Sequence, residues 1–78
     1  MDINKLKQDL GAVGTVDYCG FNGDNEDKII IKIHGFTPSA SNIRQLYSII
    51  SINNPENEFS SFENVNISGE SVVLVLQK

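Results

Sequence analysis

The sequence predicts a single α+β domain over residues 1–78, a two-layer sandwich in which two helices cover one face of a four-stranded antiparallel sheet. Apolar residues recur at helical spacing in two segments and at strand spacing in four. The order of these segments is helix, strand, strand, helix, strand, strand (αββαββ). Because the apolar stripe of a helix needs a sheet face to bury against, both helices are expected on the same side of the sheet.

The first helix is expected over residues 2–10. Its apolar residues recur at spacings of three and four, which places them on one face of the helix. These apolar residues are Ile3, Leu6 and Leu10. Asp2 is the expected N-cap, and Gly11 is the expected end of the helix.

The next two segments predict an antiparallel hairpin. Residues 15–21 alternate, with Val16 and Tyr18 on one side of the strand. The other side carries Asp17, Cys19 and Phe21. An Asn-Gly pair opens a polar turn, and residues 28–34 then have isoleucine at every second position. These isoleucines are Ile29, Ile31 and Ile33, opposed by Lys28, Ile30, Lys32 and His34.

The register of this hairpin decides which side chains share a face. A hairpin that closes symmetrically about its turn places Cys19 opposite Ile31 and leaves His34 on the other face. A shift of one residue would instead bring Cys19 and His34 to the same face. The symmetrical hairpin therefore predicts no thiol–imidazole pair, and the shifted one allows it.

A second helix is expected after Pro38, with Ser39 and Ser41 as two candidate caps. Its apolar residues have the spacing of a stripe packed on a sheet. They are Ile43, Leu46, Tyr47 and Ile50. The sequence NNP at residues 53–55 ends the helix, because proline disfavours helical geometry at the residue before it.

The second hairpin begins with a strand whose apolar residues do not all fall at alternate positions, so they have mixed parity. Phe59, Val65 and Ile67 share one parity and Phe62 has the other, which suggests a bulge or an irregular start. After a Ser-Gly-Glu turn, residues 72–76 form an unbroken apolar run, which is typical of a central strand. Two hairpins, each preceded by a helix, make a circularly permuted ferredoxin-like arrangement.

The charge of the chain bears on its partners. Ten acidic and six basic residues give a net charge of -4, which argues against binding nucleic acid. The acidic residues cluster at residues 24–27 and at Glu56, Glu58 and Glu63. They either keep exposed loops solvated or form an acidic surface that competes for a basic groove on a partner. No apolar run approaches the roughly 20 residues of a membrane-spanning helix, and no secretory signal is predicted.

No catalytic, cofactor or metal site is predicted. Cys19 and His34 are the only cysteine and the only histidine, so an internal disulfide and a Cys/His zinc site are excluded. The GAVG sequence at residues 11–14 follows a helix and lacks the lysine of a phosphate loop. The carboxylates of residues 24–27 lack the ligand spacing of a calcium loop. We therefore expect a protein that is not an enzyme.

The sheet face opposite the helices is the candidate site. It carries one side of residues 28–34 beside one parity of the last strand, and it is either solvated or a docking surface for a second protein. The predicted contact residues are Ile30, Lys32, His34, Val73 and Val75. Pairing through an edge strand is the other route to association, and the lysines are expected to oppose it.

The stretch from Ile29 to Leu76 has a recurrent order of motifs. A hydrophobic strand ending in glycine (IIIKIHG) leads to a helix (NIRQLYSIIS), a strand ending in a turn (VNISGE) and a final apolar strand (SVVLVL). This pattern resembles the extracytoplasmic ferredoxin-like domains of the inner-membrane assembly platform in type IV pilus and type II secretion machines. The resemblance implies a noncatalytic scaffold module that forms a homodimer or heterodimer on the extracytoplasmic side of the inner membrane.

Such domains follow a membrane helix and a coiled coil, so the resemblance implies membrane attachment only through a segment absent from this chain. The alternative is a small acidic inhibitor from a phage or mobile element, which blocks a basic site on a host protein. A chain that is complete as given would be expected in the cytoplasm and would favour this alternative.

Overall fold

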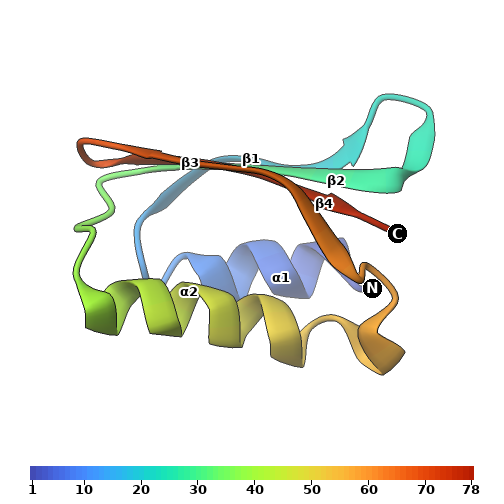
Figure 1. The fold of residues 1–78 in the computed structure, drawn as a ribbon, viewed down its shortest axis with the longest axis horizontal. Helices are drawn as coiled ribbons and strands as arrows, with labels where there is room; N and C mark the ends of the chain where they lie inside the picture. Colours follow the sequence, from blue (N-terminus) through green and yellow to red (C-terminus); the bar gives the residue numbers. More distant parts are fainter.

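The computed structural model describes all residues, 1–78, and confirms the predicted order of helices and strands. The sheet forms one layer and both helices lie side by side in a second layer against one of its faces (Figure 1). The elements are α1 (Ile3–Leu10), β1 (Thr15–Asn22), β2 (Asn25–His34), α2 (Ala40–Ile52), the 3-10 helix η1 (Pro55–Asn57), β3 (Ser61–Ser68) and β4 (Ser71–Gln77).

The sheet has the strand order β1-β2-β4-β3, and every neighbouring pair is antiparallel. The two most apolar strands, β2 and β4, therefore lie at the centre and the more polar strands form the edges. Alternate side chains of the two central strands point toward the helices and are fully buried. They are Ile29, Ile31, Ile33, Val72, Leu74 and Leu76.

The two helices complete the core. The Asp2 carboxylate accepts a hydrogen bond from Lys5 N at 3.1 Å and caps α1, as predicted. In α2, Leu46 and Ile50 are buried as expected, and Ile49 joins them. Phe36 is also fully buried, although it lies in the connection between β2 and α2. Its backbone N–H donates to Glu70 O at 2.9 Å, which fixes this connection to the turn between β3 and β4.

Strand β1 contains a bulge that changes which of its residues face the core. Val16 lies opposite Ile33 and Tyr18 lies opposite Lys32, so Asp17 is an extra residue between the two pairs. Val16 therefore packs against the core with Cys19 and Phe21. The expected grouping of Val16 with Tyr18 is wrong, because simple alternation does not survive the extra residue.

Strand β3 contains the bulge that its mixed parity suggested. Phe62 lies opposite Leu76 and Asn64 opposite Val75, so Glu63 is the extra residue. The bulge returns Phe62 to the helix side, where its ring meets Tyr47 of α2 edge-on with centroids 5.2 Å apart. Phe62 and Val65 therefore lie on the same side of the sheet, as the suggested bulge allows. Phe59 lies before the strand and is buried.

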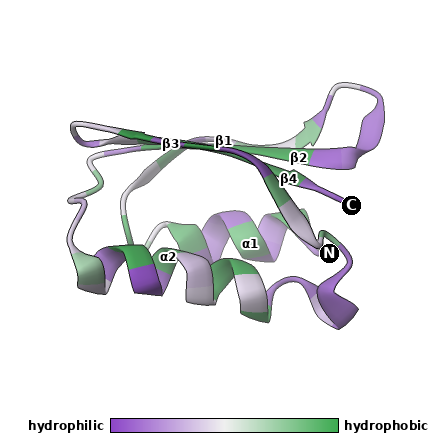
Figure 2. Ribbon diagram, viewed as in Figure 1, coloured by the Kyte–Doolittle hydropathy of each residue, from purple (hydrophilic) through white to green (hydrophobic).

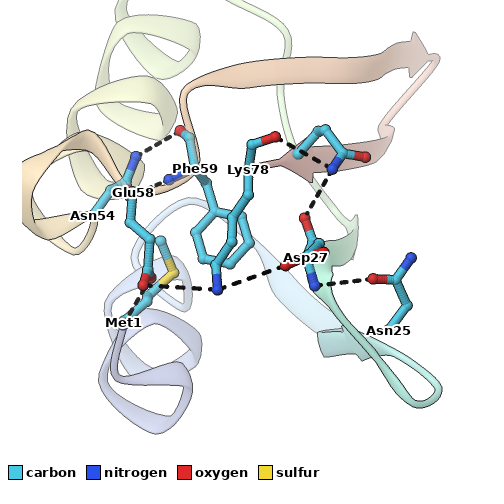
Figure 3. A network of polar contacts seen from close by, with 8 residues as sticks. Met1, Asn25, Asp27, Asn54, Glu58, Phe59 and Lys78 are labelled. Atoms are coloured by element: carbon cyan, nitrogen blue, oxygen red, sulfur yellow. Dashed lines mark hydrogen bonds and ion pairs between the residues drawn. The ribbon is translucent and has the colours of Figure 1, made fainter.

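The two ends of the chain lie close together at one end of the sandwich (Figure 1). Figure 3 shows the polar contacts that join them. The Met1 amino group and Lys78 Nζ both approach Glu58, at 3.4 and 3.9 Å, and Lys78 Nζ also lies 3.8 Å from Asp27. Beneath these charges, the Phe59 ring lies 5.5 Å from Lys78 Nζ.

Candidate functional site

The five predicted contact residues lie together on the sheet face that the helices leave uncovered. Across the two central strands, Ile30 is opposite Val75 and Lys32 is opposite Val73. His34 follows on the same side of β2, because side chains alternate along a strand. Ile30, Val73 and Val75 are partly buried, whereas Lys32 and His34 are exposed. We call these five residues the open-face cluster.

Tyr18 of β1 borders the open-face cluster. It lies opposite Lys32 in the register and is 44% exposed. Its hydroxyl donates to Phe21 O at 2.8 Å, so the ring lies along its own strand and passes over Gly20. A Cβ at Gly20 would come within 3.1 Å of that hydroxyl. Tyr18 therefore extends the apolar centre of the face toward the β1 edge.

Two polar side-chain pairs border the apolar centre of the cluster. His34 Nδ1 lies 2.7 Å from Asp17 Oδ1, because the bulge in β1 brings this carboxylate next to the end of β2. Lys28 of β2 reaches across β4 and meets Glu63 of β3 at 2.8 Å. Lys32 lies between these pairs and has no acidic side chain within ion-pair distance. The face thus has an apolar centre, a charged border and one free lysine.

Cys19 and His34 lie on opposite faces of the sheet. Cys19 is opposite Ile31, which confirms the symmetrical register of the first hairpin. Its thiol packs against the core, and this burial raises its pKa to about 11, although Lys7 acts in the opposite direction. His34 is directed to Asp17 instead. The fold therefore does not assemble a thiol–imidazole pair.

The other polar groups that the sequence singled out are dispersed. No three histidine, cysteine, aspartate or glutamate side chains come close enough to hold a metal ion. Asp24 lies in the turn between β1 and β2, and Glu26 and Asp27 lie at the start of β2, so all three belong to the strongly hydrophilic end of this hairpin in Figure 2. In the GAVG segment, Gly14 serves packing, because a Cβ there would lie 2.6 Å from Ile33 Cγ2.

Sequence reasoning missed a hollow on the helix side, between the end of α2 and the start of β3. Its volume is about 160 Å³. It is lined by Tyr47, Ile50, Ser51, Asn54, Asn57, Phe59, Ser60, Phe62 and Leu76. Phe62, which the bulge at Glu63 turns toward α2, forms part of its wall. The mixed parity of residues 59–67 was the available signal, but it did not indicate which side Phe62 would take.

Neither α1 nor α2 combines the length and the apolar character needed to cross a membrane. Comparisons of the chain with models of known protein families, with curated proteins and with solved structures found no significant match in any of the three.

Proposed function

We propose that the protein is a noncatalytic, dimerising scaffold module that binds another protein through the open-face cluster. The observation that carries this proposal is the uncovered sheet face, where Ile30, Val73 and Val75 form an apolar centre between charged groups. An apolar centre with a polar border is the usual composition of a protein–protein contact. Lys32, free of an acidic neighbour, offers a cation to a carboxylate on the partner.

The same proposal extends to the fold and the location. The strand order β1-β2-β4-β3 supports a circularly permuted ferredoxin-like fold, because moving β4 to the front of the chain gives the element order βαββαβ. A noncatalytic scaffold is also the role implied by the resemblance to pilus and secretion assembly-platform domains. On that basis we place the protein on the extracytoplasmic side of the inner membrane.

Site-specific photocrosslinking tests the open-face contact. A benzophenone amino acid at Val73 is expected to form adducts with one protein in the source cells. The matched control carries the same group at Gln45, an exposed residue of α2, and is expected not to capture that protein. The Lys32→Glu change should abolish the Val73 adduct. Identical adducts from both positions, or adducts insensitive to Lys32→Glu, would contradict the contact.

One observation favours a second candidate function, a small acidic inhibitor of a basic site. The end of the β1–β2 hairpin is strongly hydrophilic (Figure 2) and carries exposed residues at Asp24 in the turn and at Glu26 and Asp27 at the start of β2. The matching amides, Asp24→Asn, Glu26→Gln and Asp27→Asn together, remove this charge without changing side-chain shape. Partner binding that is lost in the triple variant but kept in Val73→Lys would support the inhibitor and exclude the scaffold.

A further inference from the structure

The two edges of the sheet differ in how well they are protected against pairing with another strand. Exposed edges are normally blocked by charge, proline or bulges. The β1 edge has pairing irregularities at two places, and one of them exposes Asp17. The lysines expected to oppose edge pairing, Lys28 and Lys32, lie on the central strand β2. Neither edge strand therefore contains the lysines that were expected to protect it, and β1 relies on its bulge and Asp17 instead.

The second half of β3 is the unprotected edge. From Asn64 to Ser68 the strand pairs with β4 without interruption, and it contains no charged residue and no proline. The only charged side chain of β3 is Glu63, which is already paired with Lys28 at 2.8 Å. The outer backbone groups of residues 64–68 therefore border solvent with nothing beside them that would repel another strand.

The same segment carries uncovered apolar side chains. Val65 and Ile67 face the helix layer, opposite Leu74 and Val72 of β4. Unlike those partners, which are buried, Val65 is 42% exposed and Ile67 is only partly covered. Phe62, beside Tyr47, is 43% exposed. The helix layer thus stops short of β3 and leaves an apolar strip along the neutral edge.

We propose that β3 pairs antiparallel with β3 of a second copy of this chain, in a register centred on Asn66. In this register Val65 of each copy lies opposite Ile67 of the other copy. On the other face, Asn66 meets Asn66 and Asn64 meets Ser68. Apolar side chains therefore lie opposite apolar side chains, and uncharged polar side chains lie opposite uncharged polar side chains. Such matched cross-strand pairs are favourable.

Other registers are worse. Centring the pair on Val65 places Ile67 opposite Glu63, an apolar side chain against a charge. If the register of the second copy shifts by one residue in either direction, residues on the helix side of one copy lie opposite residues on the open face of the other. The apolar side chains of the two copies would then not cover one another. The register centred on Asn66 is therefore the one in which the segment from Asn64 to Ser68 is complementary to itself.

Charge also favours a second copy as the occupant. Each chain carries -4, so two copies repel unless their acidic regions stay apart. The acidic residues 24–27 lie at the end of the β1–β2 hairpin, and β1 is at the opposite edge of the sheet from β3. The second acidic group, Glu56, Glu58 and Glu63, lies outside the segment from Asn64 to Ser68, and Glu58 and Glu63 are already paired with the Met1 amino group and Lys28. An antiparallel β3 pair keeps the two β1–β2 hairpins at the far ends of an eight-stranded sheet. A neutral edge also offers no charge to select a strongly acidic or basic peptide.

This inference rests on the proposed function and specifies where the second copy binds. A two-fold axis at Asn66 places both helix layers on one side of the continuous sheet. On the other side it joins the two open faces into one surface. A single partner protein could then contact both open-face clusters at once, which increases its apparent affinity through multivalency.

Sedimentation velocity tests the interface, over concentrations from about 10 µM to about 1 mM, where weak dimers form. Val65→Lys introduces a charge on the β3 edge, and Val73→Lys is the matched control on the open face. We expect wild type and Val73→Lys to dimerise with the same dissociation constant. The dissociation constant of Val65→Lys should be at least about tenfold higher, because the interface would then bury a charge from each copy. Equal dimerisation of Val65→Lys would overturn the β3 interface but leave the dimerising scaffold intact.

Two further outcomes separate the claims. A dimer lost in Val73→Lys and kept in Val65→Lys would place the second copy on the open face and overturn this inference. A wild-type monomer throughout the range would overturn both the interface and the dimerising part of the proposed function. If Val65→Lys fails to fold, isotope-filtered NOEs in mixed-labelled wild type decide the question. The proposed register requires intermolecular contacts between the methyl groups of Val65 and Ile67.

Discussion

Asn53 is the one buried polar residue, and its side chain joins the two helices. Its amide nitrogen donates to Asp9 Oδ2 of α1 at 3.0 Å and to Ile49 O of α2 at 2.9 Å. Its amide oxygen accepts from Lys5 Nζ at 3.3 Å. Every polar atom of this side chain therefore has a partner, which is the condition for burying an amide without a net cost.

Asn53→Ala is expected to lower the free energy of unfolding by about 1–3 kcal/mol, because it removes the side-chain hydrogen bonds that join α2 to Asp9 and Lys5 of α1. Urea unfolding at neutral pH measures this loss. The control is Asn4→Ala, a change at an exposed position of α1, which should stay within about 0.5 kcal/mol of wild type. Equal losses in the two variants would show that the Asn53 contacts do not stabilise the fold.

The same contact predicts a pH dependence. Hydrogen bonds from Lys5 and then from Asn53 favour the charged carboxylate and lower the pKa of Asp9 below its usual 3.8. A lowered pKa stabilises the folded state above 3.8, and this contribution is lost as the pH falls through the folded value. Asn53→Ala should raise the pKa of Asp9 toward 3.8 in an NMR titration of the carboxyl group. An unchanged titration would exclude Asn53 as a determinant of this pKa.

Cys19 is expected to be unreactive in the folded protein. Burial raises its pKa from 9.0 to about 11, which lowers the thiolate fraction by about a hundredfold at neutral pH. Because the folded pKa is the higher one, folding stability should fall as the pH rises from 9.0 toward 11, and Cys19→Ala should remove this fall. Alkylation rates in native and urea-unfolded protein test the first point. Equal rates would show that the native thiol is accessible and ionised.

At the scale of elements, the beginning of α2 offers a test between two serines. The Ser39 hydroxyl accepts a hydrogen bond from Asn42 N at 3.1 Å and caps the helix, whereas Ser41 is an exposed residue of the first turn. Ser39→Ala should therefore cost about 1 kcal/mol of unfolding free energy. Ser41→Ala should be neutral or slightly stabilising, because alanine has the higher helix propensity. Urea denaturation of both variants would reveal a wrong cap assignment through the opposite order.

The elements that could be predicted from the sequence are those whose signals are local and periodic. Helix α1 begins after its cap at Asp2, and Cys19 lies opposite Ile31 as expected, although the register shifts between Phe21 and Asn22 near the turn. The open-face cluster also follows from alternation, because β2 and β4 are regular and pair along their lengths. Its residues come together in the structure as expected, while their role as a contact surface remains a prediction.

The sides taken by Val16 and Phe62 have the same kind of physical cause. One extra residue at Asp17 and one at Glu63 reverse the alternation, so Val16 packs against the core and Phe62 lies on the helix side of the sheet. In a strand of eight residues, the parity of the few apolar positions does not reveal where such an insertion falls. Phe36 was missed for another reason, since a residue in a connection has no period to follow. The wall that Phe62 contributes to the hollow depends on the same bulge at Glu63.

At the scale of the whole molecule, one corner joins regions far apart in the sequence (Figure 3). The Met1 amino group, Glu58, Asp27 and Lys78 make ion pairs at 3.4 to 3.9 Å around this corner. The side chains of Glu58, Asp27 and Lys78 are all substantially exposed, so solvent and salt screen the attraction between their charges. Phe59 lies beneath them and is only 4% exposed. Burial of its ring should therefore stabilise this corner more than the charges above it.

Two substitutions separate the contributions of ring and charge. Lys78→Ala should lower the unfolding free energy by less than about 1 kcal/mol, and by still less in high salt. Phe59→Ala should lower it by about 3–5 kcal/mol, independently of salt, because it removes a buried ring and leaves a cavity. If Phe59→Ala does not fold, Phe59→Leu keeps most of the apolar volume and should lose only part of that energy. Urea unfolding at low and high salt measures all three variants, and a larger loss for Lys78→Ala than for either Phe59 variant would show that the charges hold the chain ends together.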